Sequence, residues 1–370
     1  MLSGFGSTFF SYLLPFLFVL TVVVFFHELG HFLVARYNGV RVEVFSIGFG
    51  KEIFGWTDKA KTRWKISMIP LGGYVKMFGD ANAASQPSGD LSGMSAEDQA
   101  VAFQTKRLGQ RFWIVAAGPL VNFLFAWVIL VGLFVTVGQR FTPPEVGAVI
   151  PDSAAAAAGI LPGDRIIELN GVAIERFEDV QRIIQPNPEV RVRILVLRDG
   201  ERVALTAVPE LSELSNNFGM TQKIGLLGIT RSGVEYVRHG FVVSLWRAGG
   251  EVLFISRATL EALGQIIVGS RSAKELGGPL RIAQMSGAYA EAGLVPTLGF
   301  MVMLSVTLGL INLFPIPMLD GGHLMFYIIE FVRGRPLGER TQEYCFRAGI
   351  ALVFSLMIFV TLNDLIQMVF

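Results

Sequence analysis

The sequence has little cysteine, histidine and charge. Its 370 residues include one cysteine, and only four histidines, His27, His31, His239 and His323. A single cysteine excludes a disulfide framework and a thiolate metal cluster. Lys and Arg (31) balance Asp and Glu (30), which excludes a nucleic-acid binder that relies on bulk positive charge. Because 52% of the residues are hydrophobic, a disordered chain is excluded as well.

The charges that are present leave long gaps. Only 16% of the residues are charged, whereas soluble proteins average about 25%. Uncharged, apolar runs occupy 8–26, 112–138, 292–319 and 348–363. A membrane-spanning helix needs about 20 apolar residues, and prolines within such a run are tolerated where neighbouring helices satisfy the backbone. The sequence therefore predicts four transmembrane helices.

The basic residues predict the orientation of these helices. The loop between the first two runs is rich in Lys and Arg, and four arginines precede the last run: Arg333, Arg335, Arg340 and Arg347. Basic loops stay on the cytoplasmic side, whereas long domains cross regardless of charge. We therefore expect both termini and the middle segment, 139–291, to face the outer side of the membrane.

The middle segment has the composition of a folded extramembrane domain. Short strands are expected at 146–150, 165–171, 190–200 and 202–208, and a helix at 176–185. Asn170-Gly171 and Asp199-Gly200 are typical of tight hairpin turns.

The stretch from Ala154 to Gly171 resembles bacterial PDZ domains, through the pattern A-G-I-L-P-G-D-R-I-I-E-L-N-G. Such domains bind chain ends by adding a strand to a sheet edge. A chain-end ligand is one expectation for the groove, and a domain that only blocks access is the alternative. The sequence carries one such segment. Residues 240–270 then form either an interfacial amphipathic helix or, less simply, a fifth span, because Arg247, Glu251, Arg257 and Glu261 lie within the segment.

The strongest chemical motif is His27-Glu28-Leu29-Gly30-His31 at the end of the first uncharged run. On a helix, residues i and i+4 project from one face, so both imidazoles can bind one metal ion. Two neutral imidazoles and one further ligand leave an open position on Zn²⁺, the arrangement of catalytic sites. Zinc lowers the pKa of a water that it binds to about 7, and Glu28 is placed to take the proton as the catalytic base.

A third ligand is expected at the end of the third uncharged run. The segment Asn312-Leu-Phe-Pro-Ile-Pro-Met-Leu-Asp320-Gly-Gly-His323 returns to the same side of the membrane as His27. Asp320 and His323 are both chemically able ligands, and the residues alone do not choose between them.

Together these motifs resemble the site-2 protease (M50-type) family of intramembrane zinc metalloproteases, and within it the bacterial RseP-like group. The resemblance includes Gly118-Pro119-Leu120-Val121-Asn122 and covers nearly the whole chain. It implies that Asp320 is the third zinc ligand, that Asn312 contributes to substrate binding and that His323 orients a ligand.

The resemblance also implies a membrane-dipping β-loop on the cytoplasmic side. Residues 40–47 and 63–77 are apolar with partial alternation, which is typical of strands. Such a hairpin could bind an unwound substrate segment as an added strand, or it could only pack beneath the helices. Residues 81–95 are expected to form a flexible linker.

These features predict a polytopic α-helical membrane protein with four transmembrane helices, an inserted extracytoplasmic PDZ α+β domain and a cytoplasmic-side β-rich loop. The expected segments are a first transmembrane helix (1–36), the β-loop and linker (37–108), a second transmembrane helix (109–139), the PDZ domain (140–235), an interfacial helix with the region that follows the PDZ domain (236–291), a third transmembrane segment (292–332) and a cytoplasmic loop with the fourth transmembrane helix (333–370).

The predicted activity is zinc-dependent hydrolysis of peptide bonds within or near the transmembrane segment of single-span proteins, after trimming on the outer side. The resemblance suggests anti-sigma factors or signal-peptide remnants as substrates, with the lipid bilayer as the surroundings and no nucleic acid as partner. A non-catalytic PDZ scaffold would not need Glu28 beside two histidines at metal-binding spacing. A zinc transporter would need more polar residues along its spans than Asn122 and Asn312.

Overall fold

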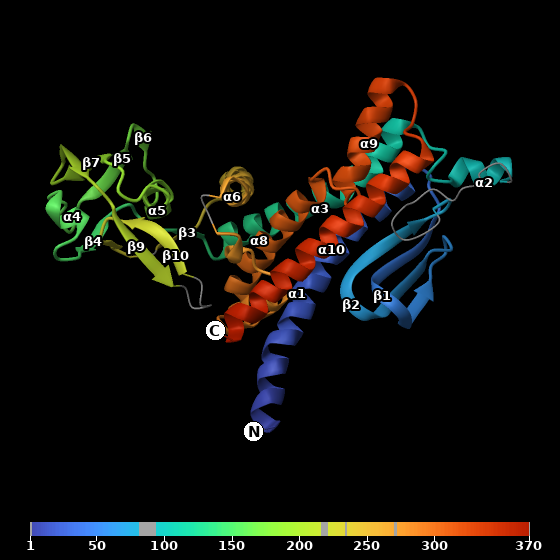
Figure 1. Ribbon diagram of the computed structural model, residues 1–370, viewed down its shortest axis with the longest axis horizontal. Coiled ribbons are helices and arrows are strands. Elements are labelled where there is room, and N and C mark those ends of the chain that lie inside the picture. Colours follow the sequence, from blue (N-terminus) through green and yellow to red (C-terminus); the bar gives the residue numbers. More distant parts are fainter. Residues whose placement is uncertain (1, 81–93, 216–220, 234, 270–271, 370) are drawn as a thin grey trace. The chain divides into compact units, whose positions relative to one another are not determined.

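The computed structural model describes residues 2–80, 94–215, 221–233, 235–269 and 272–369 (Figure 1). Residues 81–93 of the predicted linker lie outside the described residues. The chain forms two compact units. We call the first the helical unit (Met1–Val131, Leu245–Arg271 and Leu276–Leu365) and the second the β-rich unit (Gly132–Ser244, Ser272–Glu275 and Ile366–Phe370).

Long apolar helices dominate the helical unit. They are α1 (Leu2–Tyr37), α3 (Leu108–Thr136), α6 (Phe241–Val268), α7 (Pro279–Glu291), α8 (Leu294–Leu313), α9 (Asp320–Arg333) and α10 (Glu339–Val369). The short helix α2 (Ala96–Val101) also belongs to the helical unit, whereas the 3₁₀ turn η1 (Ala273–Glu275) belongs to the β-rich unit. Within the described residues, four stretches are long and apolar enough to cross a membrane: Phe10–Tyr37, Leu108–Thr136, Leu294–Leu313 and Arg340–Met368. These correspond to the four uncharged runs, and α6, the alternative fifth span, is not among them.

The third predicted segment, 292–332, consists of two helices rather than one. The first, α8, ends at Leu313 and the second, α9, begins at Asp320. Phe314 is extended, with φ −65° and ψ 143°, as expected for the residue before a proline. Pro315 and Pro317 cannot continue a helix because they lack a backbone N–H. The break therefore places Asp320 at the first position of a new helix.

The helices α1 and α3 approach each other closely at small residues. A Cβ added to Gly30 of α1 would lie 2.5 Å from the backbone oxygen of Ala117 on α3. Farther along the pair, the rings of Phe26 and Phe125 stack with centroids 4.2 Å apart. Small residues that let helix backbones approach are the usual contact between helices in membranes.

The predicted β-loop is a long antiparallel hairpin of β1 (Val42–Thr57) and β2 (Arg63–Met77). The first strand runs ten residues past the predicted end at 47 because Gly48 and Gly50 adopt positive φ and form irregularities within the strand instead of ending it. Phe45 is buried against the helices and stacks on Trp64 at 4.4 Å.

The β-rich unit centres on a four-stranded antiparallel sheet of order β6-β5-β7-β8. Its strands are β5 (Arg165–Leu169), β6 (Val172–Ala173), β7 (Val192–Arg198) and β8 (Glu201–Ala207). The two expected turns are present, since Asn170-Gly171 and Asp199-Gly200 both have positive φ at each residue, as a tight hairpin turn requires.

Three smaller strand pairs and two helices complete the β-rich unit. They are β3 (Gln139–Phe141) with β12 (Glu235–Val237), β4 (Val146–Val149) with β11 (Ile229–Arg231), β9 (Glu210–Ser215) with β10 (Thr221–Leu226), and the helices α4 (Ala154–Ala157) and α5 (Phe177–Ile184). The predicted strands at 146–150, 165–171, 190–200 and 202–208 and the helix at 176–185 are thus all present. The core of the unit is apolar, with Ile166 and Ile194 fully buried.

Candidate metal centre

Two histidines lie side by side on α1, one helical turn apart. His27 and His31 are each only 8% exposed, and their Nε2 atoms are 3.3 Å apart. The i, i+4 spacing of the His27-Glu28-Leu29-Gly30-His31 motif gives both rings the same face of the helix. Two imidazole nitrogens therefore point at one small volume.

The first residue of α9 completes this cluster. Asp320 brings its Oδ2 atom to 3.2 Å from His27 Nε2 and its Oδ1 atom to 3.5 Å from His31 Nε2. The proline-containing break after α8 allows this approach, because it starts α9 beside α1 rather than continuing α8. These three side chains form a metal-type group, with one ligand atom of each within 4.8 Å of the others.

The backbone of α3 sets the tautomer of His31. His31 Nδ1 lies 2.9 Å from the carbonyl oxygen of Ile114. A carbonyl oxygen only accepts, so Nδ1 carries the proton and Nε2 keeps a free lone pair that points at Asp320.

Asn122 on α3 plays the matching part for His27. Its amide lies 3.2 Å from His27 Nδ1, and its Oδ1 atom is buried without a partner. With the amide turned over, its Oδ1 accepts a hydrogen bond from the protonated Nδ1 of His27. The Nε2 atom of His27 then also carries a free lone pair. Sequence reasoning gave Asn122 no role at the site, although an amide inside an apolar run was the available signal.

The spacing and chemistry of these groups fit zinc. Zinc bonds of about 2.0–2.1 Å in a tetrahedron place neighbouring ligand atoms about 3.3–3.4 Å apart. The two Nε2 atoms are 3.3 Å apart, His27 Nε2 lies 3.2 Å from Oδ2 of Asp320, and His31 Nε2 lies 3.5 Å from its Oδ1. Two lone pairs and a carboxylate at these distances repel one another unless a cation lies between them. The donor set is therefore suited to Zn²⁺ with one position left open.

A glycine on α3 makes room for both imidazoles. A Cβ added to Gly118 would lie 2.2 Å from His31 Nε2 and 2.8 Å from His27 Cε1. Real Cβ atoms do not come so close, so only glycine fits this position. The packing of the two imidazoles therefore explains the glycine of the Gly118-Pro119 pair in the second uncharged run.

Glu28 lies between the histidines and the hairpin. The backbone N–H of Val75 on β2 hydrogen bonds to its carboxylate. Gly73 of the same strand packs beside the Glu28 side chain. A Cβ added to Gly73 would lie 3.1 Å from Glu28 Cγ and 2.8 Å from the backbone oxygen of Ser46. The hairpin thus holds the glutamate next to the metal-type group.

The other two predicted residues line the same cavity. Asn312 at the end of α8 places its side-chain nitrogen 3.4 Å from His27 Nε2. His323 lies one turn beyond Asp320, and its ring centroid is 5.3 Å from that of Phe346 on α10. The cavity, of about 540 Å³, is bordered by His27, Glu28, His31, Asn312, Asp320 and His323 and by residues of β1, β2 and α10.

The chain is similar to known proteins over nearly its whole length. The sequence profile of peptidase family M50 matches residues 15–356. A protein named as a zinc metalloprotease in Rhizobium meliloti is 44% identical over 369 residues, covering 96% of each chain. One from Agrobacterium fabrum is 43% identical over 367 residues, covering 97% of each. The metalloprotease MmpA of Caulobacter vibrioides is 38% identical over 377 residues, covering 95% of each.

The membrane-type helices, the zinc-type donor set and these relatives lead to one classification. The chain belongs to peptidase family M50 and is a zinc-dependent membrane metalloprotease.

Proposed function

We propose that this protease cuts single-span membrane proteins within or near their transmembrane segment, with zinc held by His27, His31 and Asp320. The observation that carries the proposal is the position of the donor set. Its three ligand atoms lie within 4.8 Å of one another, and they belong to α1, an apolar helix long enough to span a membrane, and to α9. A site built on membrane helices favours a substrate that is itself in the membrane.

Glu28 is the proposed proton carrier. Zinc, when bound, supplies Lewis acidity that activates a water at neutral pH. The Glu28 carboxylate, fixed by the Val75 N–H, accepts the proton from the attacking water and delivers it to the leaving amine. The Asn312 side chain lies next to His27 and is placed to donate a hydrogen bond to the scissile carbonyl. His323 borders the cavity beside Asp320 and is proposed to orient the ligands.

The hairpin is the proposed holder of the substrate backbone. A transmembrane helix hides its peptide groups in its own hydrogen bonds, so a substrate must be extended before it is cut. Residues Gly72–Val75 of β2 border the cavity, and a strand can bind an extended segment by edge pairing. A hairpin that only packs against α1 is the alternative.

The proposed topology follows from the charges. Both basic loops lie in the cytoplasm by the positive-inside rule, which puts the zinc site near the cytoplasmic side and the termini and the PDZ-like segment in the periplasm of the inner membrane. There, the segment would screen against bulky outer domains or bind a chain end. Substrates would thus arrive already trimmed, and anti-sigma factors and signal-peptide remnants are of this type.

The test is cleavage of a truncated single-span substrate in detergent by Glu28→Gln. General base catalysis contributes about 10²–10⁴-fold, so we expect cleavage to fall by at least about a hundredfold while zinc content stays at the parental level. Glu97→Gln, an exposed change on α2, is the control and should cleave normally. Cleavage by Glu28→Gln at the parental rate would show the mechanism to be wrong.

A further inference from the structure

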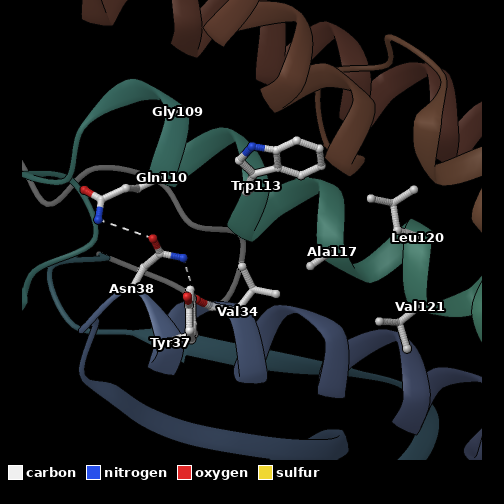
Figure 2. A pocket seen from close by; sticks show the side chains of 9 residues that line it. All are labelled: Val34, Tyr37, Asn38, Gly109, Gln110, Trp113, Ala117, Leu120 and Val121. Atoms are coloured by element: carbon white, nitrogen blue, oxygen red, sulfur yellow. Dashed lines mark hydrogen bonds between the residues drawn. The ribbon is translucent and has the colours of Figure 1, made fainter.

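A groove separates α1 from α3 beyond their close contact (Figure 2). The two helices touch at Gly30 and Ala117 and then diverge toward the end of α1. There, the gap is bridged by Gln110 Nε2, which donates to Asn38 Oδ1 at 3.2 Å. The cavity along these two helices measures about 430 Å³.

The walls of the groove are apolar. Figure 2 shows Val34, Trp113, Leu120 and Val121 around it, with the Asn38–Gln110 hydrogen bond at one end. Trp113 is 58% exposed although it lies in an apolar membrane-type helix. The groove shares no bordering residue with the described cavity of the zinc site, so it is a separate site.

Positive charge gathers where the groove ends. Lys106 and Arg107 immediately precede α3, and the first turn of α3 contains no acidic residue. The Lys106 ammonium lies against Gly39, the residue after Asn38, at 3.5 Å from the position of an added Cβ, and it donates to the Ala100 carbonyl. The start of α3 adds the partial positive charge of a helix N-terminus. An apolar slot with a cationic end matches an amphiphile whose head is anionic.

The size of the groove argues against a substrate helix as its occupant. A helix about 10 Å across fills roughly 400 Å³ in a single turn of 5.4 Å. A groove of about 430 Å³ therefore accepts about one turn of a helix, whereas a slender hydrocarbon chain can lie along it. The combination points to a lipid.

We propose that this groove binds an anionic phospholipid, with one acyl chain between Trp113 and Leu120 and the phosphate at Lys106 and Arg107. Juxtamembrane Lys and Arg attract anionic headgroups by electrostatics that act near the membrane surface. The bound lipid fills the gap between the helix that carries His27 and His31 and the helix whose Ile114 carbonyl holds His31.

The experiment measures quenching of Trp113 by brominated lipids in nanodiscs of the full chain. The Trp113 signal is the emission of the parent minus that of Trp113→Phe. We expect dibromo-phosphatidylglycerol to quench this signal about fivefold more, at equal low mole fraction, than dibromo-phosphatidylcholine. In Lys106→Gln/Arg107→Gln, whose amides still donate hydrogen bonds, the preference for the anionic lipid should vanish.

The matched control is Lys51→Gln/Lys59→Gln, two exposed lysines at β1 and the turn after it, which should keep the full preference. Equal quenching by both lipids, or equal loss of preference in the control, would overturn the proposal. Displacement of the brominated lipid by a single-span substrate peptide would instead identify the groove as a docking site for substrate, and it would also overturn the proposal. None of these results depends on whether the zinc site cleaves peptides.

Discussion

The long helices of the helical unit expose large apolar side chains, whereas the central sheet of the β-rich unit buries them. Phe354 on α10 is 63% exposed, whereas Ile166 in the β-rich sheet is 0% exposed. Conversely, His27, His31 and Asn122 are buried among apolar helices. A chain in a bilayer meets apolar surroundings outside, so its exposed apolar residues need no partner, but each buried polar group needs a specific one.

The polar residues buried around His27 and those buried in the β-rich unit have different roles. In the helical unit, the buried imidazoles and Asp320 border one cavity and form the zinc-type group, and the Asn122 amide contacts His27 Nδ1. In the β-rich unit, buried Asp164 pairs with Arg198 inside the domain and borders no described cavity of this kind. The first kind of burial should matter for metal binding, and the second for folding only.

The largest expected effect comes from filling the space beside the histidines. In Gly118→Ala, the new Cβ would lie 2.2 Å from His31 Nε2, so the imidazole must leave its position. We expect zinc content to fall below about one tenth of the parental value and cleavage to fall more than about a hundredfold. Zinc is measured by mass spectrometry of the purified protein.

Gly132→Ala, on the same helix, is the matched control, since an added Cβ there meets nothing within 4 Å. It should keep both zinc and activity. If Gly118→Ala bound zinc like the parent, the close packing of α3 against His27 and His31 would not be needed for zinc binding, and the prediction would be wrong.

A smaller effect is expected from the residue that holds His27. Metal-binding histidines whose outer hydrogen bond is lost typically lose 10–100-fold in metal affinity. In Asn122→Leu, we expect zinc affinity to fall by about that factor, measured by chelator competition. Asn122→Asp keeps an oxygen to accept from His27 Nδ1 and should retain most of the affinity. Equal loss in both variants would contradict the turned amide.

Much of the architecture could be predicted because the membrane imposes strong rules. Long uncharged runs have few alternatives, so the four candidate spans were visible. The strands and turns of the β-rich unit followed from alternation and from Asn170-Gly171 and Asp199-Gly200. The spacing of His27 and His31 likewise determined a shared helix face.

The remaining parts of the site depend on contacts between distant segments. The choice between Asp320 and His323 depends on where α9 begins and on the direction in which it runs. The prolines define where the helix begins, but only packing determines its direction. The roles of Ile114, Gly118 and Asn122 arise from the side of α3 that faces α1. A single sequence contains these residues but not their partners. The predicted strand end at 47 was wrong because β1 continues through Gly48 and Gly50 in its pairing with β2.

The smallest effect on zinc is expected from the partly buried Asp164–Arg198 ion pair of the β-rich unit. Burial by itself raises the pKa of the Asp164 carboxyl, but the Arg198 guanidinium and the Leu161 N–H outweigh it and hold that pKa below its usual range.

A carboxyl with a lowered pKa stabilises the fold at pH values above its pKa in the unfolded chain, about 3.9. This stabilisation is lost as pH falls through its pKa in the folded state. Amide exchange in β5 and β7, corrected for intrinsic rates, should therefore accelerate below about pH 4. In Asp164→Asn, the protection should already be reduced at pH 7, by about 2 kcal/mol, and should lose this acid dependence, while zinc affinity stays at the parental value. A parallel loss of zinc affinity would mean that buried polar groups in the two units are coupled rather than separate in function.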